Sequence, residues 1–143
     1  MIGREETSKR FLEEGILKPD FYYFGIFTKE NKLIGGIDLR DIDNIQRTAS
    51  LGIVIGEKEH WSKGYGTEAM NIILGYAFRE LGLRRVSLTV FEYNPRAIHC
   101  YEKVGFVHEG RIRQALKRDG KRWDILFMGI LREEWEAKQL PEK

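Results

Sequence analysis

A strand-like run that leads through a glycine-containing turn into a long amphipathic helix limits the possible folds of this chain. Residues 47–56 (RTASLGIVIG) end in a nearly continuous apolar stretch, which is typical of a strand in the centre of a sheet. From Gly64 to Leu81 the apolar residues recur at spacings of three and four, the period of a helix that buries one face. Such a helix can return the chain so that residues 86–91 (VSLTVF) lie parallel to the first run. The sequence therefore predicts a sheet with one parallel pair of strands.

Antiparallel hairpins are predicted on both sides of this unit. Residues 21–28 and 32–40 are rich in β-forming side chains, and the three polar residues between them are enough for a hairpin connection. Residues 106–117 and 122–131 alternate and are joined by a turn that contains Asp119-Gly120, a strong hairpin signal. The predicted fold is therefore α+β (mixed α/β), with a mixed and mostly antiparallel sheet flanked by helices.

Two further helices are expected. The charged segment 4–17 carries Phe11, Leu12, Ile16 and Leu17 as an apolar stripe and is predicted to be a surface helix. Residues 95–103 are predicted to form a short helix in which Asn94 can cap the start and Pro95 suits the first turn. Gly82 and Gly105 are the expected ends of the long helix and of this short one.

Composition narrows the class of protein. The 143 residues suit a single domain over 1–143, and the 24 basic and 22 acidic side chains leave a net charge of only +2, which gives no electrostatic case for a nucleic-acid partner. Cys100 is the only cysteine, so one chain can form neither a disulfide framework nor a thiolate zinc site, and no metal is expected. No apolar run is long enough to span a membrane. These features predict a cytoplasmic protein without a membrane partner.

The glycine turn is the first candidate binding site. Free backbone N–H groups at a helix start favour anions, and Gly64 and Gly66 allow a phosphate to approach the backbone closely. Lys63 adds a positive charge nearby. The spacing of the glycines does not fit a Walker loop. It resembles a dinucleotide fingerprint only through Ala69, which stands where that motif has its third glycine or an alanine. The alternative is that the two glycines only begin a helix that packs tightly on a sheet.

Two segments resemble the GCN5-related N-acetyltransferases. Residues 61–69 (WSKGYGTEA) are similar to the acyl-CoA signature of the ribosomal-protein-alanine and polyamine acetyltransferase subgroup, with Ser62 in place of a glycine. Residues 94–106 (NPRAIHCYEKVGF) are similar to the family's Asn-x-x-Ala-x-x-x-Tyr-x-x-x-Gly-Phe segment. The likeness extends from about residue 20 onward. Family members usually begin with a further strand and helix before the segment at 4–17, and this sequence is without them. A truncated chain, a second subunit that supplies the sheet edge, and reduced substrate binding are all compatible with that difference.

The resemblance implies acetyl-CoA as co-substrate and a primary amine as acceptor. It implies that Tyr101 is the general acid that protonates the departing thiolate, although a tyrosine at this place could also be a core residue. Asn94 could serve only as a helix cap, and Trp61 only as a packing residue. The positions that it assigns to coenzyme binding are Ile53, Val54, Ile55, Trp61, Ser62, Lys63, Gly64, Tyr65, Gly66, Thr67, Asn94 and Ala97.

The general base and the acceptor stay open at this point. Some relatives carry a glutamate where this chain has Thr89, so Glu92, Asp38, Glu57, His99 and a water chain are the candidate bases. A nucleophilic role for Cys100 has no supporting pattern. The acceptor can be an N-terminus, a polyamine, a lysine or a small amine.

The oligomeric state, the class of protein and the role of one cationic cluster also stay open. A homodimer could cover an exposed sheet edge. A non-catalytic acyl-CoA-binding or assembly module is the alternative to an enzyme. The cations of the last hairpin could form a solvated face, meet the 3′-phosphate of CoA or bind an acidic partner; they are Arg111, Arg113, Lys117, Arg118, Lys121 and Arg122.

Overall fold

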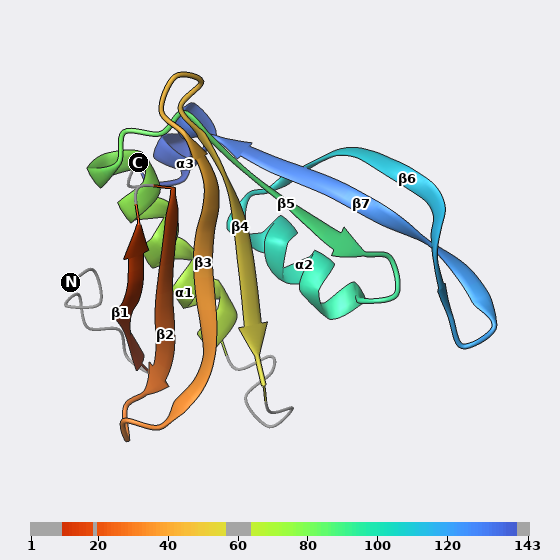
Figure 1. The fold of residues 1–143 in the computed structure, drawn as a ribbon, viewed down its shortest axis with the longest axis horizontal. Coiled ribbons are helices and arrows are strands. Elements are labelled where there is room, and N and C mark those ends of the chain that lie inside the picture. The colour runs from red at the N-terminus through yellow and green to blue at the C-terminus, as the bar shows by residue number, and fades with distance from the viewer. Residues whose placement is uncertain (1–9, 19, 57–63, 140–143) are drawn as a thin grey trace.

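The computed structural model describes residues 10–18, 20–56 and 64–139 (Figure 1). Seven strands, two α-helices, one π-helical turn and a C-terminal helix follow one another along the described chain. Their bounds are β1 Arg10–Lys18, β2 Phe21–Thr28, β3 Leu33–Asp43, β4 Thr48–Ile55, α1 Tyr65–Gly75, η3 Tyr76–Glu80, β5 Arg85–Phe91, α2 Pro95–Val104, β6 Val107–Arg118, β7 Lys121–Leu131 and α3 Arg132–Gln139.

The strands form one sheet in the order β1-β2-β3-β4-β5-β7-β6. All neighbours are antiparallel except β4 and β5, which α1 connects and which run parallel. The mixed, mostly antiparallel sheet is confirmed, and so is the central place of the run at 47–56, because β4 is the fourth of seven strands.

The predicted turns and caps of the second half are confirmed. Asp119 and Gly120 both have positive φ angles, 56° and 74°, as a two-residue hairpin turn of the I′ kind requires. The side chain of Asn94 accepts a hydrogen bond from the backbone N–H of Ala97 at 3.3 Å, and Gly105 ends α2 with a φ of 123°.

The predicted helix at 4–17 is wrong for its described part. Residues 10–18 form β1, which pairs with β2 from Arg10 opposite Thr28 to Lys18 opposite Phe21, while residues 4–9 lie outside the described chain. The register shifts between Glu14 and Ile16, so Gly15 sits at a bulge rather than inside a helix. Without β1, the backbone edge of β2 would have no partner, and the short connection favours a local hairpin. Periodicity alone could not detect this tertiary effect.

The last described element is a helix, α3, that was not predicted from the sequence. The α3 segment begins with Glu134 accepting a hydrogen bond from the backbone N–H of Leu131 at 2.9 Å, as in a capping box. Trp135 is its one buried side chain and packs on Phe78 with ring centroids 5.5 Å apart. The Arg79 guanidinium also lies over the Trp135 ring, 5.0 Å from its centroid.

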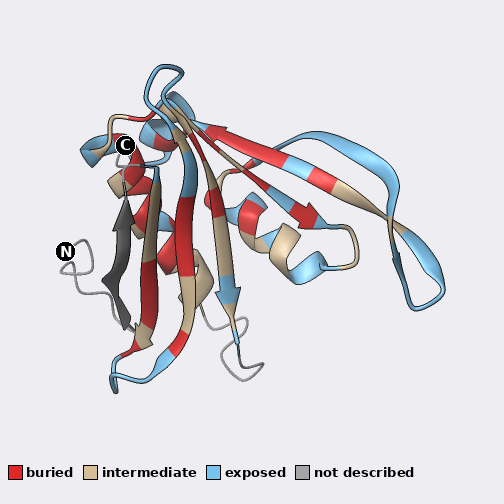
Figure 2. Cartoon of the chain, in the orientation of Figure 1, coloured by how far each residue is buried: buried red, intermediate tan, exposed pale blue. Residues whose placement is uncertain are grey.

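The core lies between the sheet and the helices (Figures 1 and 2). The α1 helix covers the back of β1–β4 in Figure 1. Of the apolar stripe predicted over 64–81, Ala69, Ile73 and Ala77 are fully buried, whereas Tyr65, Ile72 and Tyr76 are partly buried. Alternate residues of the strands point toward it, for example Ile37 and Leu39 of β3. The helix widens from its regular pattern into the π-helical turn η3 and stops before Gly82, whose φ is 68°. No helix among the described residues is long and apolar enough to cross a membrane.

Candidate functional site

The parallel strands β4 and β5 separate soon after they meet. Their pairing consists of Thr48 with Arg85, Ala49 with Val86 and Ser50 with Ser87. Beyond Ser50, β4 continues beside β3 only, and beyond Ser87, β5 continues beside β7. Figure 1 shows the two strands diverging below this point. In the described chain the backbone edge of residues 51–54 that faces β5 therefore has no strand partner.

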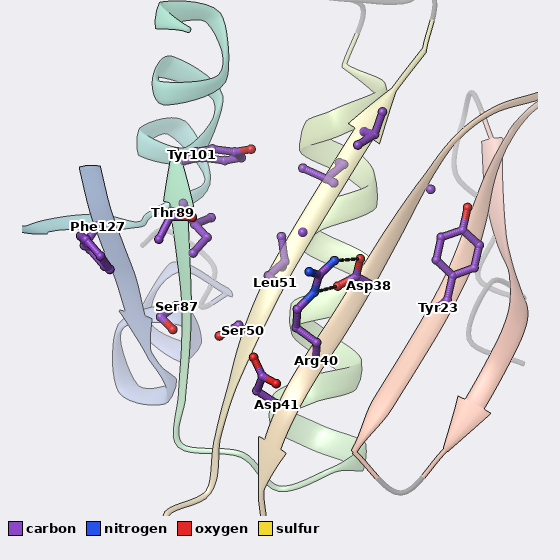
Figure 3. A pocket seen from close by; sticks show the side chains of 15 residues that line it. Tyr23, Asp38, Arg40, Asp41, Ser50, Leu51, Ser87, Thr89, Tyr101 and Phe127 are labelled. Atoms are coloured by element: carbon purple, nitrogen blue, oxygen red, sulfur yellow. Dashed lines mark hydrogen bonds and ion pairs between the residues drawn. The ribbon is translucent and has the colours of Figure 1, made fainter. Parts of the chain in front are cut away.

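A cavity of about 680 Å³ occupies the region of this divergence (Figure 3). Its volume is in the usual range of small-molecule sites. The cavity extends from the gap between β4 and β5 to the sheet face opposite α1. Its lining comprises Tyr23, Gly36, Asp38, Arg40, Asp41, Ser50, Leu51, Gly52, Ile53, Val54, Ser87, Leu88, Thr89, Tyr101 and Phe127.

Tyr101 reaches the cavity from α2 and is directed across the gap toward β4 (Figure 3). The side chain is only 8% exposed and packs on Phe106 at a centroid distance of 6.1 Å. Burial disfavours the phenolate, and this effect, with a smaller one from Cys100, raises the pKa of Tyr101 to about 12. The phenol is therefore protonated at neutral pH and is positioned as a hydrogen-bond or proton donor in the gap.

The start of α1 lies beside the same gap. Gly64 is the N-cap residue of the helix and has a φ of 88°, a conformation that favours glycine. A Cβ on Gly66 would lie 3.7 Å from both the Cys100 thiol and the Ile55 side chain, so its surroundings leave ordinary space. The Thr67 hydroxyl is 3.6 Å from the Cys100 sulfur, which joins the starts of α1 and α2. Backbone N–H groups here can bind an anion.

The predicted coenzyme positions fall into three groups. Ile53, Val54 and Ile55 lie on β4 at the gap, and the Val54 side chain is 69% exposed. Gly64, Tyr65, Gly66 and Thr67 lie at the start of α1, while Trp61, Ser62 and Lys63 lie outside the described residues. Asn94 and Ala97 lie in the first turn of α2, where the Asn94 side chain is engaged as a cap.

An ion pair forms the opposite end of the cavity. Both oxygens of the Asp38 carboxylate accept hydrogen bonds from Arg40, at 2.8 Å from Nε and 2.7 Å from Nη2. Asp38 is 8% exposed, whereas the Arg40 side chain is 53% exposed. The bond to Asp38 raises the pKa of Arg40 above its usual range. The pair lies against β4 at Gly52, where a Cβ would come within 3.2 Å of Arg40 Nη2.

This pair shows what the sequence analysis missed. From the sequence, Asp38 was predicted only as one of several candidate bases, and Arg40, Tyr23, Asp41 and Ser50 were not predicted as site residues. The signal was present in β3, where polar residues at 38 and 40 alternate with apolar residues at 37 and 39. Such alternation indicates that one strand face is polar, but it does not show that the polar face lines a cavity.

The other candidate bases lie elsewhere. Glu92 accepts a hydrogen bond from the backbone N–H of Asp124 at 2.8 Å, and His99 is exposed on α2. Glu57 lies outside the described residues. Thr89, which occupies the glutamate position of some relatives, lines the cavity but has no carboxylate. Of the candidate side chains that the structure describes, only Asp38 reaches the cavity. No group of three or more potential metal ligands occurs in the described chain.

The cations of the last hairpin lie far from the start of α1. The distal half of β6 and β7 projects away from the body of the molecule and is exposed (Figures 1 and 2). Lys117 is directly opposite Arg122, and Arg118 is directly opposite Lys121. A contact between this cluster and the 3′-phosphate of a coenzyme bound at α1 is therefore not supported.

Comparison with known proteins identifies a family match and relatives with similar sequences. Residues 3–107 match the acetyltransferase (GNAT) domain family. The chain is 35% identical over 112 residues to the spermidine N(1)-acetyltransferase of Vibrio cholerae, covering 78% of this chain and 64% of that relative. It is 31% identical over 104 residues to the Escherichia coli spermidine N(1)-acetyltransferase, covering 73% of this chain and 55% of that relative. It thus spans less than two thirds of the length of these two proteins.

The fold is also similar to that of solved structures of N-acetyltransferases. The dodecameric spermidine N-acetyltransferase of Vibrio cholerae superposes with a TM-score of 0.77 at 32% sequence identity, covering 86% of this chain and 71% of that one. The splayed parallel strands, the glycine-led helix and the sequence signatures are thus accompanied by a match over most of the described fold. This chain belongs to the GNAT acetyltransferase family.

Proposed function

We propose that this chain transfers an acetyl group from acetyl-CoA to a primary amine by direct attack of the amine. One observation carries the proposal. The pairing of β4 and β5 ends at Ser50 and Ser87, and the buried phenol of Tyr101 lies in the gap that opens beyond them. A thioester in this gap would have a proton donor beside its sulfur and a cavity on its far side.

The coenzyme is proposed to bind along β4 and at the start of α1. Backbone groups of residues 51–54 face the gap and can hydrogen-bond the amides of the pantetheine chain as a neighbouring strand would. The pyrophosphate is assigned to the backbone N–H groups of residues 62–67, of which Gly64 to Thr67 are described. Ala97 and Asn94 are assigned to the wall beside the pantetheine chain.

The chemistry requires a neutral amine, a polarised carbonyl and a proton for the leaving sulfur. The lone pair of the amine nitrogen forms the new C–N bond, and the C–S bond of the tetrahedral intermediate then breaks. The sulfur leaves as a thiolate, toward which Tyr101 directs its proton, and the surplus proton of the nitrogen passes to water. Solvent supplies the proton of the free CoA thiol, either directly or by replacing one that Tyr101 has given up, so protons balance over a turnover.

The test combines binding with turnover. Acetyl-CoA is titrated by calorimetry, and release of free CoA is followed with a thiol reagent over a panel of amines. The enzyme hypothesis predicts binding together with CoA release that depends on the amine. Binding with no release for any amine would support the non-catalytic module instead, and the absence of binding would exclude both.

A matched pair of variants tests the coenzyme position. Gly66→Glu adds a carboxylate where the pyrophosphate is proposed, and we expect the affinity for CoA to fall by at least about tenfold through charge repulsion. Gly110→Glu is the control, because a Cβ on Gly110 meets nothing within 4 Å and its strand lies outside the proposed site. Equal affinities of the two variants would contradict the assignment.

A further inference from the structure

The end of the cavity beyond Tyr101 offers an acceptor a route to a thioester in the gap. The α1 side of the gap is the side assigned to the coenzyme, so the acceptor approaches from the opposite face of the sheet. On that face the lining residues are contributed by β2, β3 and β4, including Tyr23, Asp38, Arg40 and Ser50 (Figure 3). This inference rests on the proposed function, because it concerns the acceptor of the same reaction.

The charges on this face are few and largely paired. Among the described lining residues, two carboxylates, Asp38 and Asp41, and one guanidinium, Arg40, carry charge, which leaves a formal charge of −1. Arg40 engages both oxygens of Asp38, so that carboxylate is already neutralised by a cation of the chain. An acceptor with several ammonium groups would meet one surplus carboxylate and would be repelled by the exposed Arg40.

The ion pair lies against neighbouring residues of β2 and β4. Asp38 lies between Tyr23 and Gly52 in the strand register. The space above Gly52 is filled by the pair itself, with Asp38 Oδ2 3.3 Å and Arg40 Nη2 3.2 Å from where a Cβ would be. The Tyr23 ring occupies the corresponding space above Gly36. Two glycines thus allow the side chains of this face to lie flat on the sheet, and the pair is preorganised before any acceptor arrives.

The same pair affects the choice of base. Asp38 is the only candidate base that reaches the cavity among the described side chains, and both of its oxygens accept bonds from Arg40. An amine with a pKa of about 10.4 is neutral in less than about 0.1% of molecules at pH 7, whereas an α-amino group with a pKa near 7.8 is neutral in about 10–15%. A weakly basic amine can lose its proton to water and has less need of a protein base.

From these observations we infer that the Asp38–Arg40 pair selects the acceptor, admitting a weakly basic amine with one positive charge, such as an α-amino group, and disfavouring polyamines. Arg40 is the residue that determines this specificity, because its charge cancels the carboxylate that would otherwise attract a second ammonium group. Asp38 positions Arg40.

The test compares a peptide amide with a free N-terminus against spermidine, by kcat/KM, in the wild type and in Arg40→Gln. The wild type is expected to prefer the peptide. Arg40→Gln exposes the Asp38 carboxylate, and the ratio of spermidine to peptide kcat/KM is expected to rise at least about tenfold. Arg84→Gln is the matched control, because Arg84 forms a surface pair with Glu133 at 3.3 Å away from the cavity lining, and its ratio should equal that of the wild type.

A double variant guards against misfolding of Arg40→Gln. Asp38→Asn combined with Arg40→Gln removes both charges, preserves the formal −1 of the lining and should keep the preference of the wild type. The inference is overturned if the wild type prefers spermidine, if Arg40→Gln changes the ratio by less than about twofold, or if the double variant prefers spermidine. Turnover with neither amine, despite acetyl-CoA binding, would instead count against the proposed function as well.

Discussion

Replacing Tyr101 with phenylalanine removes one buried hydroxyl from the gap and tests its role directly. With its pKa near 12, the phenol is a weaker acid than a thiol of pKa about 8.5 by roughly 3.5 pKa units, which corresponds to about 4.8 kcal/mol for complete proton transfer to the thiolate. We therefore expect Tyr101 to act mainly by donating a hydrogen bond to sulfur as negative charge develops there. A hydrogen bond to a charged group contributes about 1.5–3 kcal/mol, which predicts a 10- to 150-fold lower kcat for Tyr101→Phe.

The assay is CoA release at saturating acetyl-CoA and amine, with CoA affinity measured in parallel. The affinity should change little, because the hydroxyl matters most once charge appears on sulfur. Tyr22→Phe is the control, since Tyr22 contacts the ring of Tyr76 at 5.7 Å and is not among the residues of the cavity. A loss of kcat below about threefold, or an equal loss for Tyr22→Phe, would refute the reasoning.

The raised pKa of Tyr101 has a second consequence. The folded pKa of about 12 exceeds the ordinary value of 10, so the protonated phenol stabilises the fold fully below pH 10, and this contribution declines as the pH rises toward 12. The decline is at most about 1.4 kcal/mol per pH unit. Urea unfolding at pH 8, 10 and 11 should show the wild type losing stability relative to Tyr101→Phe only above pH 10. A difference that begins below pH 9 would contradict the assigned burial.

Two predictions concern stability alone. In Gly35→Ala a Cβ would lie 2.1 Å from the Val54 carbonyl oxygen, so the strands must shift and the free energy of unfolding should fall by about 1–3 kcal/mol. Gly110→Ala is the control and should have no such effect, because a Cβ there meets nothing within 4 Å. Equal urea midpoints for the two variants would contradict this prediction. Lys121→Glu places a carboxylate directly opposite Arg118 and should raise the urea midpoint at low salt. This increase should disappear near about 1 M salt, because salt screens exposed charges. A change that does not depend on salt would exclude an electrostatic origin.

The parts of the fold that could be predicted are those with a local physical cause. Asp119-Gly120 adopts the positive φ angles of its turn, and Asn94 caps α2, because short-range chemistry decides both. Residues 10–18 could not be assigned in the same way. Their apolar stripe suits a helix, and only the available edge of β2 makes them a strand.

The candidate site likewise has a part that could be predicted from the local sequence and a part that could not. Sequence signatures predicted Tyr101 and the glycine turn, whose chain positions can be recognised from the sequence alone. The sheet face that is proposed to bind the acceptor could not be predicted. It brings together Tyr23, Asp38 and Gly52, which lie side by side on three neighbouring strands. Which side chains meet in such a row depends on strand pairing, and the charge balance of the cavity depends on the contact between Asp38 and Arg40.

The early end of pairing between β4 and β5 also means that the two wings of the sheet share a seam of only three residue pairs. A coenzyme tail bound in the gap beyond these three pairs would lie between β4 and β5 like an additional strand and would hold the two halves of the sheet together. Slower amide exchange in residues 51–54 and a higher melting temperature would then report its arrival before any chemistry occurs.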